Sequence, residues 1–131
     1  MTLEHNIRQA YINTLLDGGF TRLADGITNP IEGYIVGGVT EPTTMVLHAD
    51  VEVGEQYAEF TKLWHKYEML LHQHTSGKYG GGMGMGTWIH EGQIYFDLVQ
   101  HMYNLDVATN MAKERGEIAI YDCKNQKDLL L

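Results

Sequence analysis

The stretch GTWIHEGQIYFDLV, residues 86–99, contains two β-rich runs that meet at Glu91-Gly92. Aromatic and β-branched residues favour strands, and a two-residue connection with glycine in second place is typical of a β-hairpin. This stretch therefore predicts an antiparallel hairpin. The segments on either side of it are interpreted by the same local patterns.

A helix and a second strand pair are expected after the hairpin. Asp106 is a candidate N-cap for a helix over VATNMAKERG, residues 107–116, which Gly116 would end. EIAIYD, residues 117–122, predicts a strand. CKNQKDLLL, residues 123–131, supplies a turn and a last apolar strand.

Two further helices are expected before the hairpin. From Glu55 to about His72 the apolar residues share one helical stripe, formed by Tyr57, Phe60, Trp64, Tyr67 and Leu71. The N-terminal segment has the same spacing at Ile7, Ala10, Tyr11 and Leu15. Gly18-Gly19 would end that first helix, because glycine adopts the left-handed cap most easily.

Short strands are expected between these two helices. Phe20 to Ala24 predicts a strand before an Asp25-Gly26 turn, and Asn29-Pro30 prevents a helix from continuing. GYIVGG, residues 33–38, and TTMVL, residues 43–47, are β-rich and are separated by a proline-containing turn, which predicts a hairpin. The whole order indicates an α+β fold over a single domain, residues 1–131, with about three helices and a mostly antiparallel sheet.

The glycine-rich segment GKYGGGMGMG, residues 77–86, is the one anomaly of composition. A phosphate-binding P-loop needs G-x-x-x-x-G-K-[ST] between a strand and a helix, but here Lys78 precedes Tyr79 and the expected order is helix then strand. The G-x-G-x-x-G spacing of dinucleotide sites is not met either. Two interpretations remain open, a connector that ends the helix and a mobile flap over a binding site.

The charge balance limits the classes of partner. The chain has 17 acidic and 9 basic residues and a formal charge of −8, which disfavours nucleic acid. No stretch approaches the roughly 18 apolar residues of a membrane span, and no signal peptide is recognisable. One cysteine, Cys123, precludes an internal disulfide. We therefore expect a cytoplasmic protein without a membrane partner.

Neither a metal centre nor catalysis is specified by the sequence. His65, Glu68 and His72 share one helical face, but the two imidazoles are about 10 Å apart, so we expect no metal and no cofactor. Acid–base candidates are present at Glu91, Asp97, Glu114 and Asp122. Such carboxylates are usually solvated, and no nucleophile motif accompanies them, so we expect no enzyme activity.

A ligand constellation is suggested by aromatic and basic residues in the C-terminal half. Aromatic faces stack on bases and arginine forks onto phosphate, which suits a nucleotide-like ligand. Core packing is the competing explanation for each aromatic side chain. The set comprises Tyr79, Trp88, Tyr95, Phe96, Tyr103 and Tyr121, with Lys113, Arg115 and Lys124 as cations. From this set, with Asn104 added for its chemistry, the candidate ligand-binding residues are Tyr79, Trp88, Tyr95, Asn104, Arg115 and Lys124.

GYIVGG at residue 33, GTWIHEGQIYFDL at residues 86–98 and the ending ERGEIAIYDCKNQKDLLL resemble a family of small proteins from phages, prophages and plasmids. Among characterised phage proteins of this size and layout, the chain is similar in style to the Thoeris anti-defence sponge family. That resemblance implies a homo-oligomer that binds cyclic ADP-ribose signals in an infected bacterial host and holds them intact. The longer GGGMGMG segment departs from the family's pattern.

Two other functions remain open. The charge of −8 suits an acidic phage inhibitor that binds a host defence or DNA-binding protein directly. An enzyme that cleaves a nucleotide signal with histidines and carboxylates is a third alternative. Self-association is expected from Leu129-Leu130-Leu131 and from the wide apolar stripe of the long helix, because a small core leaves part of this surface uncovered.

Overall fold

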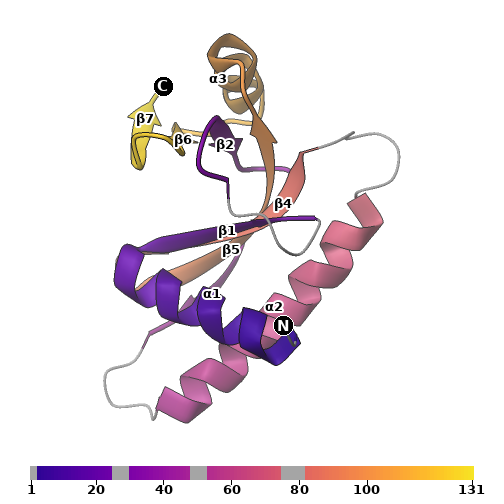
Figure 1. Ribbon diagram of the computed structural model, residues 1–131, viewed down its shortest axis with the longest axis vertical. Coiled ribbons are helices and arrows are strands. Elements are labelled where there is room, and N and C mark those ends of the chain that lie inside the picture. The colour runs from indigo at the N-terminus through magenta and orange to yellow at the C-terminus, as the bar shows by residue number, and fades with distance from the viewer. Residues whose placement is uncertain (1–2, 25–29, 48–52, 75–81) are drawn as a thin grey trace.

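The computed structural model describes residues 3–24, 30–47, 53–74 and 82–131. Its helices are α1 (Leu3–Asp17), α2 (Val53–His74) and α3 (Leu105–Glu114). Its strands are β1 (Gly19–Leu23), β2 (Tyr34–Val36), β3 (Thr43–Val46), β4 (Met83–His90), β5 (Gln93–Met102), β6 (Ala119–Asp122) and β7 (Lys127–Leu130). The strands form one antiparallel sheet in the order β1-β4-β5-β2-β6-β7, with β3 also beside β5 (Figure 1). The predicted α+β class with a mostly antiparallel sheet is confirmed.

The hairpin that the sequence predicts is formed by β4 and β5. Glu91 and Gly92 have φ angles of 50° and 77°, so both turn residues are left-handed, as a two-residue type I′ turn requires. The turn sets the register, which aligns His90 with Gln93 and Trp88 with Tyr95. The strand assignments for the segments around Phe20, Tyr34, Thr43, Ala119 and Lys127 are confirmed as well.

The hairpin predicted between GYIVGG and TTMVL is wrong, because β2 and β3 both pair with β5 instead of with each other. Val36 aligns with Gln100, and Thr43 aligns with Phe96, so the two strands follow one another along the same edge of β5. β5 has ten residues and is long enough to accept both. Residues 37–42 connect β2 to β3 outside the sheet. The chain turns within this segment at Gly38, whose φ angle is 78°.

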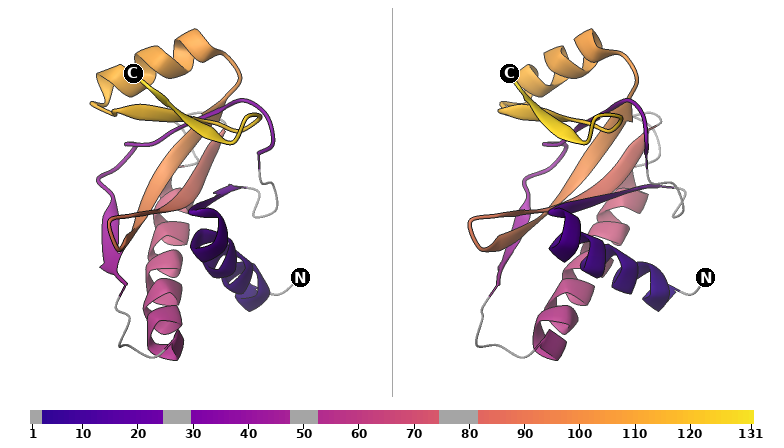
Figure 2. Two further views of the ribbon diagram at one scale, coloured as in Figure 1. Left: turned by 90° about the vertical axis from the view of Figure 1, so that its left-hand side faces the viewer. Right: turned by 60° about the vertical axis from the view of Figure 1, so that its left-hand side comes forward.

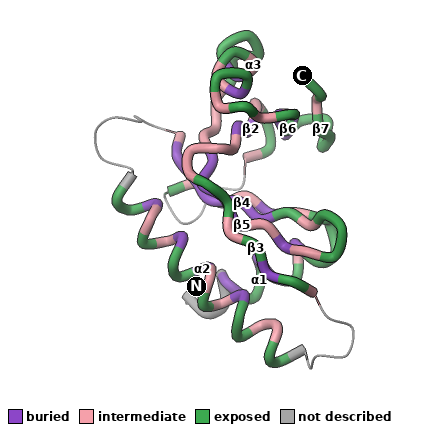
Figure 3. The backbone as a smooth tube through the Cα atoms, turned by 180° about the vertical axis from the view of Figure 1, so that it is seen from behind, coloured by how far each residue is buried: buried purple, intermediate pink, exposed green. Residues whose placement is uncertain are grey.

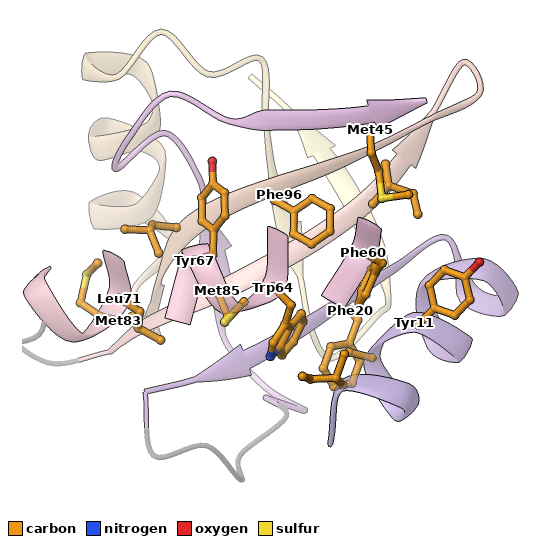
Figure 4. Packing of buried hydrophobic residues seen from close by; sticks show 14 residues of the cluster. Tyr11, Phe20, Met45, Phe60, Trp64, Tyr67, Leu71, Met83, Met85 and Phe96 are labelled. Carbon is orange, nitrogen blue, oxygen red and sulfur yellow. The ribbon is translucent and has the colours of Figure 1, made fainter. Parts of the chain in front are cut away.

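The main core lies between the sheet and helices α1 and α2. Phe60, Trp64 and Tyr67 of α2 are at most 2% exposed and point toward the strands (Figure 4). The Phe60 ring lies 5.0 Å from that of Phe96 on β5. The predicted stripe of α2 is therefore confirmed, with Tyr57 half-buried at its edge.

The N-terminal helix differs from its predicted stripe at one position. Ile7, Ala10 and Tyr11 are buried as expected, but Leu15 is 43% exposed. Thr14 takes the inward position, and its hydroxyl lies 2.6 Å from that of Thr87 on β4. The helix ends at Asp17, and Gly18 follows with a φ of 84°, which agrees with the predicted glycine cap.

Helix α3 covers the far end of β5 together with the β6–β7 hairpin (Figure 2). Ala108 and Ala112 pack on Val36 and Ile120 in a second small cluster. The predicted cap Asp106 is wrong, because Asn104 caps the helix: its side-chain oxygen accepts a hydrogen bond of 3.0 Å from the Val107 amide. Gly116, with a φ of 74°, ends the helix as predicted.

The C-terminal part of the glycine-rich segment forms a strand. Met83 to Gly86 belong to β4, whereas Tyr79 and the other residues at 77–81 lie outside the described residues. At Gly84 a side chain would meet the neighbouring strand, since a Cβ there would lie 2.7 Å from the Arg22 carbonyl oxygen of β1. This glycine is therefore explained by the close approach of two strands.

The Gly84→Ala variant is expected to unfold more easily by about 1–3 kcal/mol, because the new methyl group forces β1 away from β4. Urea denaturation measures this change through the free energy of unfolding. The matched control is Gly54→Ala at the start of α2, where a Cβ meets nothing within 4 Å. That control should be neutral or up to about 1 kcal/mol more stable, since alanine is the better helix former. Equal stability of the two variants would contradict the close approach.

Candidate functional site

The sheet has one face that α1 and α2 leave uncovered, here called the helix-free face. Side chains alternate along a strand, so the neighbours of the core residues point to this side. Buried positions are concentrated where β4 and β5 cross the middle of the molecule, and the tip of their hairpin is exposed (Figure 3). The helix-free face of the central strands consists of Gly19, Thr21, Leu23, Thr44, Val46, Gly84, Gly86, Trp88, His90, Gln93, Tyr95, Asp97, Val99 and His101.

A stacked pair of aromatic side chains stands on this face. The rings of Trp88 and Tyr95 are 4.2 Å apart between centroids and 14° from parallel. Trp88 is nevertheless 43% exposed. The residue that aligns with it on β1 is Gly19, which has no side chain to cover the indole. The Tyr95 ring thus stacks on the indole from β5, the His90 ring lies 5.8 Å from it between centroids along β4, and Gly19 places no side chain over it from β1.

A buried carboxyl group follows the aromatic pair along β5. Asp97 lies two residues after Tyr95 on the same face and is 7% exposed. Its Oδ2 atom accepts a hydrogen bond of 3.0 Å from the Gly38 amide. Its Oδ1 atom is buried and has no hydrogen-bond partner among the described residues. Unpaired buried polar atoms are rare, so this atom requires an explanation.

The pKa of Asp97 is raised to about 7, chiefly because burial penalises the charged carboxylate. The Gly38 amide lowers the pKa by donating to the carboxylate, the nearby Glu117 carboxylate raises it, and the Arg115 guanidinium lowers it. The pKa of Glu117 is likewise raised by burial, against the effect of Arg115. The protonated form of Asp97 is therefore substantially populated at neutral pH.

Asp97, Glu117 and Arg115 meet where the chain leaves the sheet after β2. A Cβ placed on Gly37 would lie 2.5 Å from Asp97 Oδ2 and 2.6 Å from Glu117 Oε1, so these two oxygens are at most about 5 Å apart. Arg115 donates from Nη1 to the Gly37 carbonyl oxygen at 3.3 Å and from Nη2 to Gln100 Oε1 at 2.8 Å. We call Asp97, Glu117 and Arg115 the carboxyl cluster. Its contacts with Gly37 and Gly38 hold in place the start of the segment that connects β2 to β3.

The structure brings some of the predicted ligand-binding residues together and separates others. Trp88 and Tyr95 are in direct contact, whereas Arg115 belongs to the carboxyl cluster. Asn104 is occupied as the N-cap of α3, and Lys124 is exposed in the turn between β6 and β7. Tyr79 lies outside the described residues. The aromatic pair and the carboxyl cluster are linked through β5, because Tyr95 and Asp97 are adjacent on one face.

Sequence reasoning missed the importance of the carboxyl cluster. Asp97 was expected to be solvated like other carboxylates, but it lies within the apolar run YFDLV, and this position was the available signal for burial. Glu117 and Gly37 carry no comparable signal. They are brought to Asp97 by the pairing of β2 with β5 and by the end of α3, which are not local in sequence.

The exposed side of α2 is a weaker candidate site. His65, Glu68, Met69, His72 and Gln73 line a shallow depression of about 440 Å³. His65 Nδ1 lies 3.0 Å from Glu68 Oε1. Among the described residues no group of three or more histidine, cysteine, aspartate or glutamate side chains is placed to hold a metal ion. A depression on a single helix offers little enclosure for a ligand.

Comparison with known proteins gives no relative for this chain. A scan against protein-family models, a search of curated proteins and a search of solved structures each found no match. Within the ranges that the structure describes, none of the helices is both long and apolar enough to cross a lipid bilayer. The function must therefore be argued from the helix-free face itself.

The pKa of Asp97 predicts a pH-dependent stability. Because the pKa of Asp97 in the folded protein lies above the ordinary aspartate pKa of 3.8, the folded protein binds the proton more tightly than the unfolded chain. This contribution to stability is fully present below about pH 4 and is lost as the pH rises to about 7. A difference of about 3 pKa units corresponds to about 4 kcal/mol.

The Asp97→Asn variant should remove this dependence, since asparagine has nearly the same shape and does not titrate. Its free energy of unfolding minus that of the wild type should rise by about 4 kcal/mol between pH 4 and pH 8. Urea denaturation at several pH values measures this difference. Asp128→Asn, at an exposed position of β7, serves as control and should show a constant difference. A constant difference for Asp97→Asn as well would contradict the buried carboxyl.

Proposed function

We propose that the protein binds a nucleotide-derived immune signal of the cyclic ADP-ribose type and sequesters it without cleavage, as an anti-defence protein in the cytoplasm of a phage-infected bacterium. The observation that carries the proposal is the exposed indole of Trp88, backed by Tyr95 and left open on the side of Gly19. Stacking on an aromatic side chain is a common way to hold a base.

Several features of the site support binding by a preformed surface. Trp88 and Tyr95 stand on paired strands, and their stack is fixed by the type I′ turn a few residues away. A side chain held by a neighbour loses little conformational freedom when a ligand arrives, which favours affinity. The resemblance of the sequence to the Thoeris anti-defence sponge family names the class of ligand.

Depletion of a compound from solution tests the proposal. The purified protein is incubated with a panel of cyclic ADP-ribose isomers and cyclic oligonucleotides, and the free compounds are measured by mass spectrometry before and after the protein is denatured by heat. We expect one compound to disappear and to return with its mass unchanged. Return as a new mass would indicate an enzyme, and absence of depletion would contradict the proposal for that panel.

The Trp88→Ala variant should bind the depleted compound roughly 5- to 150-fold more weakly, because stacking contributes about 1–3 kcal/mol per base. Trp88→Phe should lie between the wild type and the alanine variant. Tyr103→Ala is the matched control, since this ring is 74% exposed and contacts His101 away from the aromatic pair. Equal affinity of the Trp88 and Tyr103 variants would exclude the indole from the site.

A second candidate function is direct inhibition of a host defence or DNA-binding protein. The formal charge of −8 favours it, because an acidic surface attracts the basic site of a nucleic-acid-binding protein. Pull-down from a host lysate distinguishes the two functions. A stoichiometric protein partner that is released by salt supports inhibition, whereas co-purification of small molecules alone supports sequestration.

We also propose that the protein is a homo-oligomer. The apolar stripe of α2 is used within the core, but Leu16, Ile118 and Leu130 remain 77%, 82% and 83% exposed. Ile118 and Leu130 lie on the same hairpin, where the Leu131 amide donates to the Ile118 carbonyl oxygen. Neighbouring exposed apolar side chains favour association.

Light scattering at micromolar concentration should give a mass above that of one chain, 14.8 kDa. Replacement of an exposed contact residue, Leu130→Ser, should lower the mass without changing the free energy of unfolding by more than about 0.5 kcal/mol. A monomeric wild-type protein would contradict self-association.

A further inference from the structure

β7 is the last strand of the sheet, and no described strand pairs with its outer edge. It lies with β6 at the end of the molecule away from α2 (Figure 2). The Leu131 amide donates to the Ile118 carbonyl oxygen, and Leu130 aligns with Ala119. Hydrogen-bonded and non-hydrogen-bonded pairs alternate in an antiparallel ladder. The backbone amides and carbonyls of Asp128 and Leu130 therefore point away from β6, toward the outer edge.

The outer edge of β7 has few of the features that prevent pairing with another strand. Proteins protect such edges with proline, with bulges and with charged side chains. β7 contains no proline, and its register with β6 is continuous from Lys127 to Leu130. Its two charged residues, Lys127 and Asp128, have opposite signs. Leu130 is 83% exposed because the residue that aligns with it, Ala119, is too small to cover it.

We propose that the homo-oligomer is a two-fold symmetric dimer in which β7 pairs antiparallel with β7 of a second copy, with Leu129 at the symmetry axis. This inference rests on the self-association proposed above and names the surface that mediates it. In this register Asp128 of each copy aligns with Leu130 of the other. The outward amide and carbonyl of each residue then meet the carbonyl and amide of its counterpart, so every outward group of both strands is paired.

Other registers use the edge less well. A shift that places Asp128 opposite Asp128 of the second copy brings two like charges together, which is destabilising. It also aligns Leu130 with Gln126, whose φ of 53° takes the chain out of the strand. A shift in the other direction aligns Leu130 with Leu130 and leaves the outward groups of Asp128 without a partner in β7. The register centred on Leu129 is therefore favoured.

The apolar side chains support the same register. Leu129 aligns with Ile120 and packs at the margin of the small cluster beneath α3, where it is half-buried. In the two-fold pair both α3 helices lie on one face of the joined sheet, and the two Leu129 side chains meet between them. The side chains of a non-hydrogen-bonded pair are the closest in an antiparallel ladder. The dimer thus joins two small clusters and removes leucine surface from water.

The distribution of charge favours approach of a second copy at this hairpin. Residues 118–131 contain two acidic residues, Asp122 and Asp128, and two lysines, Lys124 and Lys127. The hairpin is therefore neutral, and the formal charge of −8 is carried by the rest of the chain. Two acidic copies repel each other through their summed charges. This repulsion is weakest where the neutral hairpins face one another.

The Asp128→Pro variant tests the pairing, because proline removes an outward amide that the β6–β7 hairpin does not use, as proline on edge strands commonly does. Light scattering over a series of concentrations should show the wild type approaching twice the mass of one chain, 14.8 kDa. Asp128→Pro should dimerise roughly 10-fold more weakly or less, since the dimer loses this amide in both copies. The matched control Asp128→Asn keeps the amide and should dimerise like the wild type.

A disulfide tests the register without disturbing the backbone. The Leu129→Cys variant, with Cys123→Ala to remove the native thiol, places two thiols at the symmetry axis. Cα atoms of a non-hydrogen-bonded pair are about 4.5 Å apart, which is within the range that a disulfide spans. Oxidation with diamide should give a covalent dimer. Leu16→Cys in the same background is the control, since this exposed residue of α1 lies far from the proposed axis, and it should remain a single chain.

The outcomes distinguish this inference from the functions proposed above. A monomeric wild-type protein would overturn both self-association and the pairing of β7. An Asp128→Pro variant that dimerises as tightly as the wild type would overturn the pairing of β7 alone, as would a covalent dimer of Leu16→Cys without one of Leu129→Cys. A dimer that is lost in Asp128→Pro and cross-linked at Leu129→Cys supports the inference, whether or not the wild type depletes a cyclic ADP-ribose isomer.

Discussion

The backbone hydrogen bonding of β5 is the constraint on which the rest of the molecule depends. β4 pairs along one edge of this strand, and β3 and β2 follow one another along the other. Its side chains also serve separate clusters, since Phe96 and Leu98 pack under α2, whereas Met102 packs beside α3. β5 also carries Tyr95 of the aromatic pair and Asp97 of the carboxyl cluster. The positions of both groups of residues therefore depend on this one strand.

Glycine residues determine which side chains of the helix-free face are exposed and which are enclosed. Gly84 permits β1 to approach β4, and Gly19 has no side chain beside Trp88, whereas the space above Gly86 is bordered by the side chains of Val99 and Thr21. Asp97 is then enclosed from the other side by the chain at Gly37 and Gly38. The helix-free face therefore carries an exposed indole at Trp88 and, two residues along β5 from Tyr95, the buried carboxyl group of Asp97, whose pKa burial raises to about 7.

Local sequence patterns were sufficient to predict the helices and strands, but they did not predict how the strands pair. The stripe of α2 and the turn at Glu91-Gly92 are encoded within a few residues, and once a two-residue turn is assumed the contact of Trp88 with Tyr95 follows from the register. The pairing of β2 with β5 is determined by a strand much later in the chain, and the carboxyl cluster depends on that pairing. The N-cap was missed because Asn104 and Asp106 are both acceptable capping residues, and only the backbone geometry distinguishes them.

The order of the strands has a consequence for synthesis on the ribosome. β1, β2 and β3 are made first, yet their partners lie in β4 and β5, where Gly19 aligns with Trp88 and Tyr34 with Met102. β1 therefore remains without its partner until β4 has left the exit tunnel, and β2 and β3 remain without theirs until β5 has left it. Unpaired strand edges invite association with other chains, and pairing between distant segments is slow. The nascent N-terminal third is thus the part of this protein most dependent on protection by chaperones.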